Sequence, residues 1–397
     1  MLSCGEPSGD LYAGALVRAL RTRDPHLQAF GLGGERLGAA GAEIIESFHG
    51  LSVTGLTEAI KVLPRSWAAY RRLVAAARAR RPDVLVLIDY PDFNFRLMRA
   101  VKALGVPVVY YISPQLWAWR AGRMATMQAL VDRVLVIFPF EEELYRKAGV
   151  DVRFVGHPLV ELAAPGADRA TLAHEFGLDP SRPVVALLPG SRHNELARLV
   201  PVLRAAAARI AAAVPGVQFL VARAPHLGDE LFAPFRNELA AGTEVPALRT
   251  SGQSERRGFS PGGPIRIVEG RTDDVLSVSD LVLTASGTAT VQAAIHGKPM
   301  VVLYKLSPLT YTLGKPLARV DMYAMVNLIA GRRIVRELIQ EACTPEAVAD
   351  EAIDLLGNET RRREMIEALE GVTRALGGSG GSARAADAIV DLVSGRG

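Results

Sequence analysis

A short run of acidic and polar residues, Asp89-Tyr90-Pro91-Asp92-Phe93-Asn94, follows the apolar stretch at residues 84–88. A continuous apolar run of this length is typical of a strand that is buried on both faces. In open parallel sheets, ligands bind beyond the carboxyl ends of the strands, which is where Asp89 falls. A carboxylate at that place can act as a general base. Asp92 has a competing role as the N-cap of the following helix, with Asn94 as the other cap candidate.

Glycines flank a second polar turn, Gly5-Glu6-Pro7-Ser8-Gly9-Asp10, which runs directly into the helical pattern of residues 11–21. Such a turn offers backbone N–H groups and the positive end of a helix dipole to a phosphate or a sugar oxygen. In a βα unit the turn should follow a buried strand, yet only residues 1–4 precede it, fewer than a strand normally has. The sequence therefore predicts a truncated first strand.

Two turns in the second half combine small or hydroxyl-bearing residues with predicted helix starts. Leu188-Pro189-Gly190-Ser191-Arg192 ends an apolar run and precedes a helical pattern. An arginine beside a helix N-terminus makes a good diphosphate site, and the alternative is an ordinary turn with a solvated arginine. Ala285-Ser286-Gly287-Thr288-Ala289-Thr290 also lies between a strand and a helix, where hydroxyl residues are commonly caps. Together the two turns predict two walls of one nucleotide pocket.

Short apolar strands alternate with amphipathic helices along both halves of the chain. The predicted strands include residues 84–88, 106–112, 134–138, 184–188, 219–222, 265–268, 281–284 and 300–303. This rhythm is typical of parallel sheets with helices on both faces. We therefore predict an α/β protein of two doubly wound, Rossmann-like domains, residues 1–162 and 163–397. The second domain would carry a surface insertion at residues 240–264 and C-terminal helices interrupted by a flexible glycine-rich loop at residues 377–382.

Composition excludes several classes of protein. The 397 residues are 49% hydrophobic and 22% charged, which is typical of a globular protein, and a net charge of +4 does not demand nucleic acid. No apolar run approaches the ~20 residues of a membrane span. The seven histidines and two cysteines show no metal-ligand spacing, and so few cysteines suit a reducing cytoplasm. ATP and NAD are poor candidates because neither a Walker lysine nor a G-x-G-x-x-G turn follows a strand.

Eight motifs occur in one order along nearly the whole chain, and together they closely resemble the lipid-A-disaccharide synthase family. They are residues 5–10 and 89–94, Ser-Pro-Gln-Leu-Trp-Ala-Trp-Arg at 113–120, Pro-Phe-Glu at 139–141, Val-Gly-His at 155–157, residues 188–192 and 286–290, and Asn-Leu-Ile-Ala-Gly at 327–331. The resemblance implies an inverting, metal-independent glycosyltransferase of the GT-B type. In that type two Rossmann-like domains face a cleft, with the donor nucleotide on the C-terminal domain and the acceptor mainly on the N-terminal one.

The family reaction transfers 2,3-diacylglucosamine from UDP-2,3-diacylglucosamine to 2,3-diacylglucosamine 1-phosphate (lipid X). The products are the β-1,6-linked lipid A disaccharide 1-phosphate and UDP. By resemblance, Asp89 is the catalytic base, and no cofactor or metal ion is expected because the UDP-sugar is a substrate. The resemblance places UDP binding on Ser191, Arg192, Ser286, Gly287, Thr288, Gln292 and Asn327, and substrate in the cleft on Glu6, Ser8, Gly9 and Asp10.

Both substrates carry acyl chains, so the resemblance implies peripheral contact with the cytoplasmic face of the inner membrane. A homodimer is compatible with it, and nucleic acid is not an expected partner. A partly amphipathic pattern near several arginines carries the candidate acyl contacts Val53, Leu56, Ile60, Leu63 and Trp67. Exposed aliphatic residues beside tryptophan and arginine suit a membrane interface. The alternative is an ordinary core-facing helix, which has the same period.

One departure from the family pattern concerns Gln292, which stands where the family usually has a glutamate. An amide cannot make a charge-assisted hydrogen bond to a nucleotide ribose, so we expect weaker donor binding. Two alternatives stay open at this point. The chain could be another GT-B enzyme of UDP-sugars, such as a 2-epimerase, or a non-catalytic protein that binds a nucleotide sugar or a lipid.

Overall fold

The computed structural model describes residues 1–51, 56–114, 121–236, 265–306 and 322–395, with no side-chain description for residues 56–62 and 121. The predicted insertion at residues 240–264 lies outside this description. The described residues divide into two compact units. Unit 1 holds Met1–Leu162 and the residues from Arg374 onward, and unit 2 holds those from Ala163 to Thr373. The C-terminal segment was predicted to belong wholly to the second domain, and this assignment is wrong from Arg374 onward.

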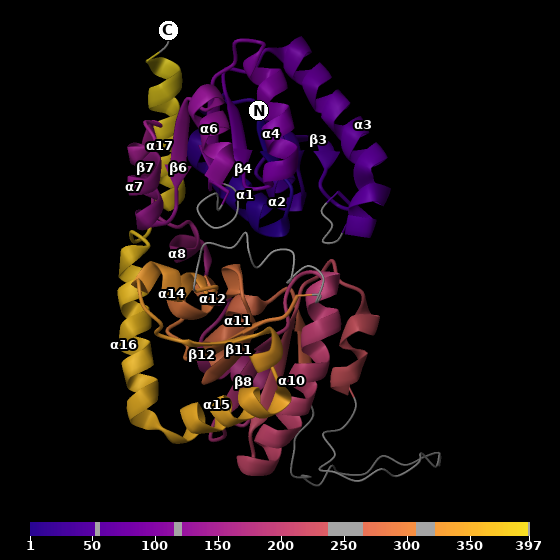
Figure 1. Ribbon diagram of the computed structural model, residues 1–397, viewed down its shortest axis with the longest axis vertical. Helices are drawn as coiled ribbons and strands as arrows, with labels where there is room; N and C mark the ends of the chain where they lie inside the picture. The colour runs from indigo at the N-terminus through magenta and orange to yellow at the C-terminus, as the bar shows by residue number, and fades with distance from the viewer. Residues whose placement is uncertain (52–55, 115–120, 237–264, 307–321, 396–397) are drawn as a thin grey trace. The chain divides into compact units, whose positions relative to one another are not determined.

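Unit 1 is built on a seven-stranded parallel sheet in the order β3-β2-β1-β4-β5-β6-β7 (Figure 1). Its strands are β1 (Leu2–Cys4), β2 (Phe30–Gly33), β3 (Glu43–Ser47), β4 (Leu85–Ile88), β5 (Val108–Tyr111), β6 (Arg133–Val136) and β7 (Val152–Phe154). Its helices are α1 (Pro7–Arg21), α2 (Glu35–Ala39), α3 (Leu56–Arg80), α4 (Pro91–Lys102), η1 (Ala121–Arg123), α6 (Met124–Leu130), α7 (Pro139–Lys147), α8 (Leu159–Leu162) and α17 (Gly381–Ser394).

The residues before the first turn form a central strand of this sheet. In β1, Leu2 pairs with Gly31 of β2 on one side and with Val86 of β4 on the other. All four residues 1–4 are buried. The sequence predicts a truncated first strand, and three residues form a strand here because two neighbouring strands supply their hydrogen bonds.

Unit 2 contains a six-stranded parallel sheet in the order β10-β9-β8-β11-β12-β13. Its strands are β8 (Val184–Leu188), β9 (Gln218–Arg223), β10 (Arg266–Glu269), β11 (Leu281–Ala285), β12 (Met300–Tyr304) and β13 (Arg336–Ile339). Its helices are α9 (Arg169–Glu175), α10 (His193–Ala213), η2 (Asp229–Arg236), α11 (Thr272–Val278), α12 (Thr288–Ile295), α14 (Met325–Ala330), η4 (Gln340–Ala342), α15 (Pro345–Gly357) and α16 (Glu359–Ala375), whose last residues belong to unit 1. Two parallel α/β sheets confirm the predicted fold class.

Hydrogen bonds hold the glycine-rich loop between α16 and α17, which the sequence predicts to be flexible. The Glu161 carboxylate accepts hydrogen bonds from the backbone N–H groups of Gly380 (2.7 Å) and Ser382 (3.0 Å). The Arg384 guanidinium donates to the carbonyl oxygens of Val155 (2.8 Å) and Gly377 (3.0 Å). The loop therefore delivers α17 to unit 1, where it packs against α1 and lies beside β6 (Figure 1).

His157 is buried close to this loop. Its ring meets the ring of Tyr12 edge-on, with centroids 5.9 Å apart, and its Nδ1 accepts a hydrogen bond from the backbone N–H of Leu159 at 3.1 Å. Burial lowers the pKa of His157 to about 3. The imidazole is therefore neutral in the folded protein at neutral pH.

Acid should destabilise the fold through this histidine. In the unfolded chain a histidine takes up a proton near pH 6.5, whereas His157 in the folded protein does so only near its pKa of about 3. The free energy of unfolding therefore does not depend on His157 above pH 6.5 and decreases as the pH falls from 6.5 toward 3. We expect about 1.4 kcal/mol to be lost per pH unit within this window. His157→Asn keeps an acceptor for the backbone of Leu159 and does not titrate there.

Urea denaturation of both proteins at pH 7 and pH 5 checks this expectation. The free energy of unfolding should decrease less for the variant than for the parent between the two pH values. Equal decreases would show that His157 is protonated in the folded state.

Candidate active site

The strand order of unit 1 reverses between β1 and β4. Cys4 and Ile88, the last residues of these neighbouring strands, are paired in the sheet. The predicted turns that begin at Gly5 and Asp89 therefore leave the same edge of the sheet side by side. Such a reversal point is where open α/β sheets bind their ligands.

The two turns of unit 1 are in close contact. A Cβ atom on Gly5 would lie 2.2 Å from Cγ of Tyr90, so only glycine fits beside this ring. The Tyr90 hydroxyl donates to the carbonyl oxygen of Leu51 at 3.0 Å. Burial and the nearby Glu6 carboxylate raise the pKa of Tyr90 to about 12. Glu6 and Ser8 are half-buried here, and their substrate contacts stay predictions.

Backbone strain is concentrated at Asp89. Asp89 and Tyr90 have φ values of 45° and 50°, and Ile112, directly after β5, has a φ of 60°. The Asp89 N–H donates to the carbonyl oxygen of Ile112 at 3.1 Å, so the strained residues are joined. Each such residue costs about 1–3 kcal/mol, and such residues cluster at functional sites. Nothing in the local sequence signals the strain at Ile112.

Asn94 holds the strained turn from inside the protein. Its side-chain amide donates to the carbonyl oxygen of Asp89 at 2.7 Å, and its Oδ1 accepts from the Ser3 hydroxyl at 2.6 Å. The Tyr110 hydroxyl donates to the same Asp89 carbonyl at 2.8 Å. Asn94 and Tyr110 are fully buried. These residues position the Asp89 backbone, a role that the sequence analysis missed.

The predicted helix caps at Asp92 and Asn94 are wrong. Tyr90 is the N-cap of α4, and it makes no side-chain cap hydrogen bond. Because Pro91 is the first helical residue, Asp92 falls within the first turn, where its carboxylate forms an ion pair with Arg123 at 2.5 Å. Asn94 lies further inside the helix and points into the core.

Asp10 has a structural role, and its predicted contact with substrate stays a prediction. Its carboxylate is only 3% exposed and accepts hydrogen bonds from three backbone N–H groups at the start of α2. They belong to Gly34 (2.7 Å), Arg36 (2.9 Å) and Leu37 (3.2 Å). This arrangement caps α2 from a distant part of the chain. The neighbouring Gly9 is buried against Cys4, since a Cβ atom there would lie 3.2 Å from that of the cysteine.

Unit 2 has its own reversal point, between β8 and β11. Leu188 pairs with Thr284 near the ends of these strands. The next helices, α10 and α12, have Arg192 and Gly287 as N-caps, and neither cap makes a side-chain hydrogen bond to its helix. Two helix N-termini therefore start from adjacent strands, an arrangement that favours an anion. The fold brings together the predicted residues Ser191, Arg192, Ser286, Gly287 and Thr288 at this edge.

Glu195 organises the turn after β8. Its carboxylate accepts a hydrogen bond from the Ser191 backbone N–H at 3.0 Å and pairs with the Arg192 guanidinium at 3.4 Å. A Cβ atom on Gly190, whose φ is 117°, would lie 2.4 Å from Oε2 of this carboxylate. The Arg192 side chain is 42% exposed, so solvent and ligands can reach it. The sequence analysis missed the role of Glu195.

Tyr304, at the carboxyl end of β12, is a further residue of this region that the sequence analysis missed. Burial, with a smaller contribution from Glu195, raises the pKa of Tyr304. Its ring lies 5.7 Å from that of Tyr323, whose carbonyl oxygen accepts a hydrogen bond from the Ser286 hydroxyl at 2.8 Å. A tyrosine that ends an apolar strand is the only local signal for it.

Gln292 lies beside a carboxylate supplied by another helix. Its amide donates to Oδ1 of Asp273 at 3.3 Å, and Nε2 of His296 lies 2.9 Å from the same oxygen. Asp273 is in the first turn of α11. A carboxylate is thus present next to α12 although residue 292 is an amide, and the sequence analysis did not identify it.

Asn327, which the sequence predicts to bind the donor, has an internal structural role, and its contact with the donor stays a prediction. It is fully buried, and its amide donates to the carbonyl oxygen of Val335 (3.0 Å) and to Glu337 (2.8 Å). Its Oδ1 accepts from the backbone N–H groups of Ile334 (2.8 Å) and Val335 (3.0 Å). The side chain thus fastens the turn before β13 to α14. Its amide nitrogen and its Oδ1 both hydrogen-bond within unit 2.

The candidate acyl contacts lie on or before α3, and the structure describes two of their side chains. Val53 lies outside the described residues, and so do the side chains of Leu56 and Ile60. Leu63 is 52% exposed and Trp67 56% exposed. Further along, α3 buries Ala69, Leu73 and Ala77 in the core, so the helix has both a core face and exposed apolar residues. Among the described residues, every helix is too short or too polar to cross a membrane.

Two doubly wound units, each with polar residues gathered where its strand order reverses, define the GT-B class of glycosyltransferases and related nucleotide-sugar enzymes. A family model described as "Lipid-A-disaccharide synthetase" matches residues 1–252 and 264–386, and the chain belongs to this family of glycosyltransferases. The lipid-A-disaccharide synthase of Myxococcus xanthus (strain DK1622) is 42% identical over 99% of this chain and 97% of its own length. That of Trichlorobacter lovleyi is 40% identical over the same shares.

Solved structures support the fold at much lower sequence identity. The UDP-GlcNAc 2-epimerase from Neisseria meningitidis bound to UDP-GlcNAc is 12% identical, with a TM-score of 0.64 over 99% of this chain and 98% of that one. The calicheamicin glycosyltransferase CalG4 is 17% identical, with a TM-score of 0.58 over 100% and 97% of the two chains. At these identities the likeness concerns the fold alone.

The reassigned role of Asn327 can be tested by Asn327→Ala. We expect a loss of about 2–4 kcal/mol in the free energy of unfolding, because buried backbone groups and Glu337 lose their partner. Urea denaturation measures this loss. An unchanged stability combined with weaker UDP binding would restore the donor-binding role that the sequence predicts.

Proposed function

We propose that this protein transfers 2,3-diacylglucosamine from UDP-2,3-diacylglucosamine to 2,3-diacylglucosamine 1-phosphate, with inversion at the anomeric carbon. The observation that carries the proposal is the match to lipid-A-disaccharide synthases along both units of the chain. The polar clusters at the two reversal points support it, because one offers a carboxylate and the other offers anion-binding groups. The likeness to epimerases is one of fold alone.

Asp89 is the proposed catalytic base. The acceptor 6-hydroxyl must lose a proton as its oxygen attacks the anomeric carbon from the face opposite UDP. A carboxylate within hydrogen-bond reach can take that proton. The strained backbone of Asp89, held by Asn94, Tyr110 and Ile112, fixes where its side chain begins. Preorganisation of this kind avoids reorganisation during the reaction.

Unit 2 is proposed to stabilise the leaving UDP. Negative charge accumulates on the diphosphate as the glycosidic bond to the donor breaks. The Arg192 guanidinium and the N-termini of α10 and α12 offer positive charge and N–H dipoles for it. We propose that these groups suffice without a divalent cation. Thr288 and Ser191 are exposed at this edge, and Asp273 beside Gln292 offers a carboxylate for hydroxyl groups of the donor.

Peripheral membrane contact is proposed through α3. Leu63 and Trp67 expose apolar surface, and the Trp67 ring stacks on Tyr70 with centroids 5.1 Å apart. Arg65 and Arg71 are exposed on the same helix and suit anionic headgroups. Acylated substrates reside in a bilayer, which in this proposal is the cytoplasmic face of the inner membrane.

One assay tests the proposed reaction. The protein is incubated with both acylated substrates, and mass spectrometry follows UDP release and formation of the disaccharide 1-phosphate. A parallel reaction contains EDTA and should proceed at the same rate. Donor turnover in the absence of the acyl acceptor, or UDP binding without a disaccharide product, would contradict the proposal and favour one of the two alternative functions.

Two substitutions should separate catalysis from donor binding. Asp89→Asn is nearly isosteric and tolerates the left-handed backbone, so we expect kcat to fall about 10²–10⁴-fold with UDP affinity unchanged. Arg192→Ala should instead weaken UDP binding about tenfold or more, because it removes a charge-assisted contact. Calorimetry with UDP and the disaccharide assay measure the two effects. A wild-type rate in the first variant, or wild-type affinity in the second, would remove that residue from its assigned role.

Membrane binding through α3 can be tested with a double variant, Leu63→Ser and Trp67→Ser. We expect about tenfold weaker binding to anionic vesicles, because two exposed apolar side chains no longer enter the interface. Val390→Ser is the matched control, since Val390 is 37% exposed on α17. Sedimentation with phosphatidylglycerol vesicles provides the measurement. If the vesicles retained the parent protein, the double variant and Val390→Ser equally, α3 would be excluded as the membrane contact.

A further inference from the structure

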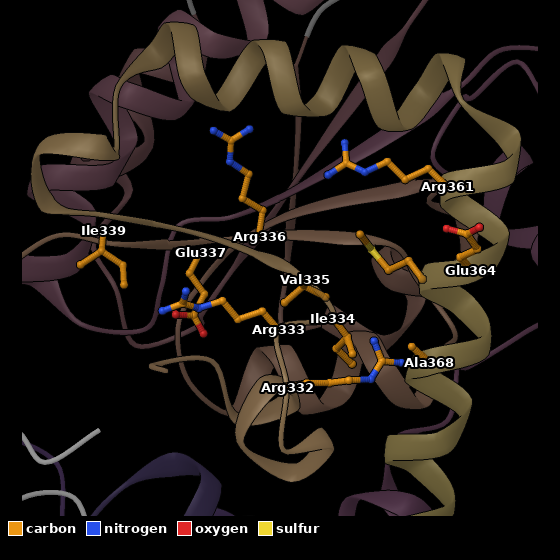
Figure 2. A pocket seen from close by; sticks show the side chains of 11 residues that line it. Arg332, Arg333, Ile334, Val335, Arg336, Glu337, Ile339, Arg361, Glu364 and Ala368 are labelled. Atoms are coloured by element: carbon orange, nitrogen blue, oxygen red, sulfur yellow. The ribbon is translucent and has the colours of Figure 1, made fainter. Parts of the chain in front are cut away.

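A cavity of about 660 Å³ lies in unit 2 along β13 and the first turns of α16. β13 is the last strand of its sheet, so the cavity borders the edge of the sheet. Four arginines line it, namely Arg332, Arg333, Arg336 and Arg361. Figure 2 shows Arg361 extending from α16 toward Arg336 of β13, and Arg332 extending from the preceding loop toward α16. Apolar side chains, among them Ile334 and Met365, line the same cavity.

The arginines of the cavity lie at a different edge of the sheet from the proposed donor residues. The donor residues follow β8 and β11, at the carboxyl ends of the strands. The loop that carries Arg332 and Arg333 precedes β13, and the backbone N–H of Met300, at the start of β12, lies 3.4 Å from Sδ of the cavity residue Met365. The cavity lining also runs along β13 to Ile339, which pairs with Tyr304 at the carboxyl end. Arg332, Arg333 and Arg336, however, lie before or at the start of β13, at the amino ends of the strands and opposite to the donor residues.

Buried carboxylates hold two of the arginines in place. The Glu351 side chain is only 2% exposed and lies between Arg336, at 2.8 Å, and Arg361. Arg361 also pairs with Asp354. Each guanidinium has five N–H donors in a rigid plane, so such pairing orients the group and leaves further donors for a ligand. The Arg336 side chain stays 52% exposed and the Arg361 side chain 38% exposed.

The loop that carries the other two arginines is also held in place. Asn327 accepts hydrogen bonds from the backbone N–H groups of Ile334 and Val335, directly after Arg333. The one acidic residue of the cavity near this loop, Glu337, accepts hydrogen bonds from the backbone N–H groups of Tyr323 (3.1 Å) and Ala324 (2.8 Å), besides that from Asn327. Its negative charge is therefore largely compensated within the protein.

We propose that this cavity binds a phosphate monoester or diphosphate group, at a site distinct from that of the donor nucleotide. Guanidinium groups on a fixed framework suit phosphate oxygens, because each can donate two parallel hydrogen bonds. The adjoining apolar surface accommodates the organic part of the ligand. Glu364, the other carboxylate of the lining, opposes an anion and limits the affinity.

Pyrophosphate, titrated calorimetrically in the presence of excess UDP, is the probe for this site. UDP occupies the proposed donor site, so the arginine cavity should still bind pyrophosphate. Arg332→Glu should weaken this binding about tenfold or more, since it reverses a charge that would contact the ligand. Glu364→Gln should strengthen it about threefold, because a repelling charge is removed.

Arg363→Glu is the matched control, because Arg363 is exposed on α16 and does not line the cavity. Its affinity for pyrophosphate should stay within about twofold of the parent value. Arg332 and Glu364 are the test positions because neither partners the buried Glu351, so the fold should be preserved; thermal denaturation confirms this for each variant.

A lipid arm distinguishes a membrane phosphate from a soluble one. Vesicles of phosphatidylcholine are compared with vesicles that also contain phosphatidic acid, a lipid phosphate monoester. Pyrophosphate binding that depends on Arg332 supports a site for a soluble phosphate. Binding to phosphatidic acid vesicles that depends on Arg332 supports a site for a lipid phosphate. The proposal would be overturned if excess UDP abolished pyrophosphate binding and if binding to the phosphatidic acid vesicles did not depend on Arg332. It would also be overturned if Arg332→Glu and Arg363→Glu lost equal affinity for pyrophosphate. A protein that fails to bind UDP would contradict the proposed function, yet its Arg332 dependence would still report on the cavity.

Discussion

The hydrogen bonds of the Asn94 side chain are the interaction on which the candidate base depends. They connect Ser3 of β1, the last residue of β4 and the Asp89 carbonyl in one buried network. A residue with positive φ relaxes unless its surroundings hold it, and Asp89 is followed by a second such residue. The network counters this tendency, so the core of unit 1 determines the backbone position of the carboxylate proposed to take the acceptor proton.

The same physical constraint shapes both units. In a doubly wound sheet two neighbouring central strands are followed by connections that run to opposite sides of the sheet. The polar groups that follow these two strands therefore lie next to each other. In unit 1 these are the turns after β1 and β4, and Gly5 lets them touch because a side chain would collide with Tyr90. In unit 2 they are the turns after β8 and β11, where two helices begin without side-chain caps. One sheet thereby offers a carboxylate, and the other offers positive potential.

Two predicted ligand residues have structural roles inside their units. Asp10 caps α2, and Asn327 fastens the loop before β13. Both lie within motifs that carry the family resemblance, so a motif residue can serve the site by shaping its surroundings. The hydrogen bonds of Asn327 also hold the loop that carries Arg332 and Arg333, and they thereby support the arginine cavity along β13. Conversely, no local pattern marks Asp273 or Glu195, and only its position at the end of an apolar strand marks Tyr304.

The amino-acid sequence by itself determined the fold class, most of the strands, and the turns that carry Asp89, Arg192 and Ser286, but it did not predict β2, β3 or β13. Local rules suffice for these features, because buried parallel strands are apolar throughout and ligand-binding turns follow them. Only the tertiary structure decided which polar residues turn into the core. The carboxylate of Asp10 and the amide of Asn327 turn inward because buried backbone N–H groups, distant or several residues away in the sequence, require partners. The return of α17 to unit 1 likewise depends on contacts between residues more than two hundred positions apart, such as Glu161 with Gly380, which no local pattern encodes.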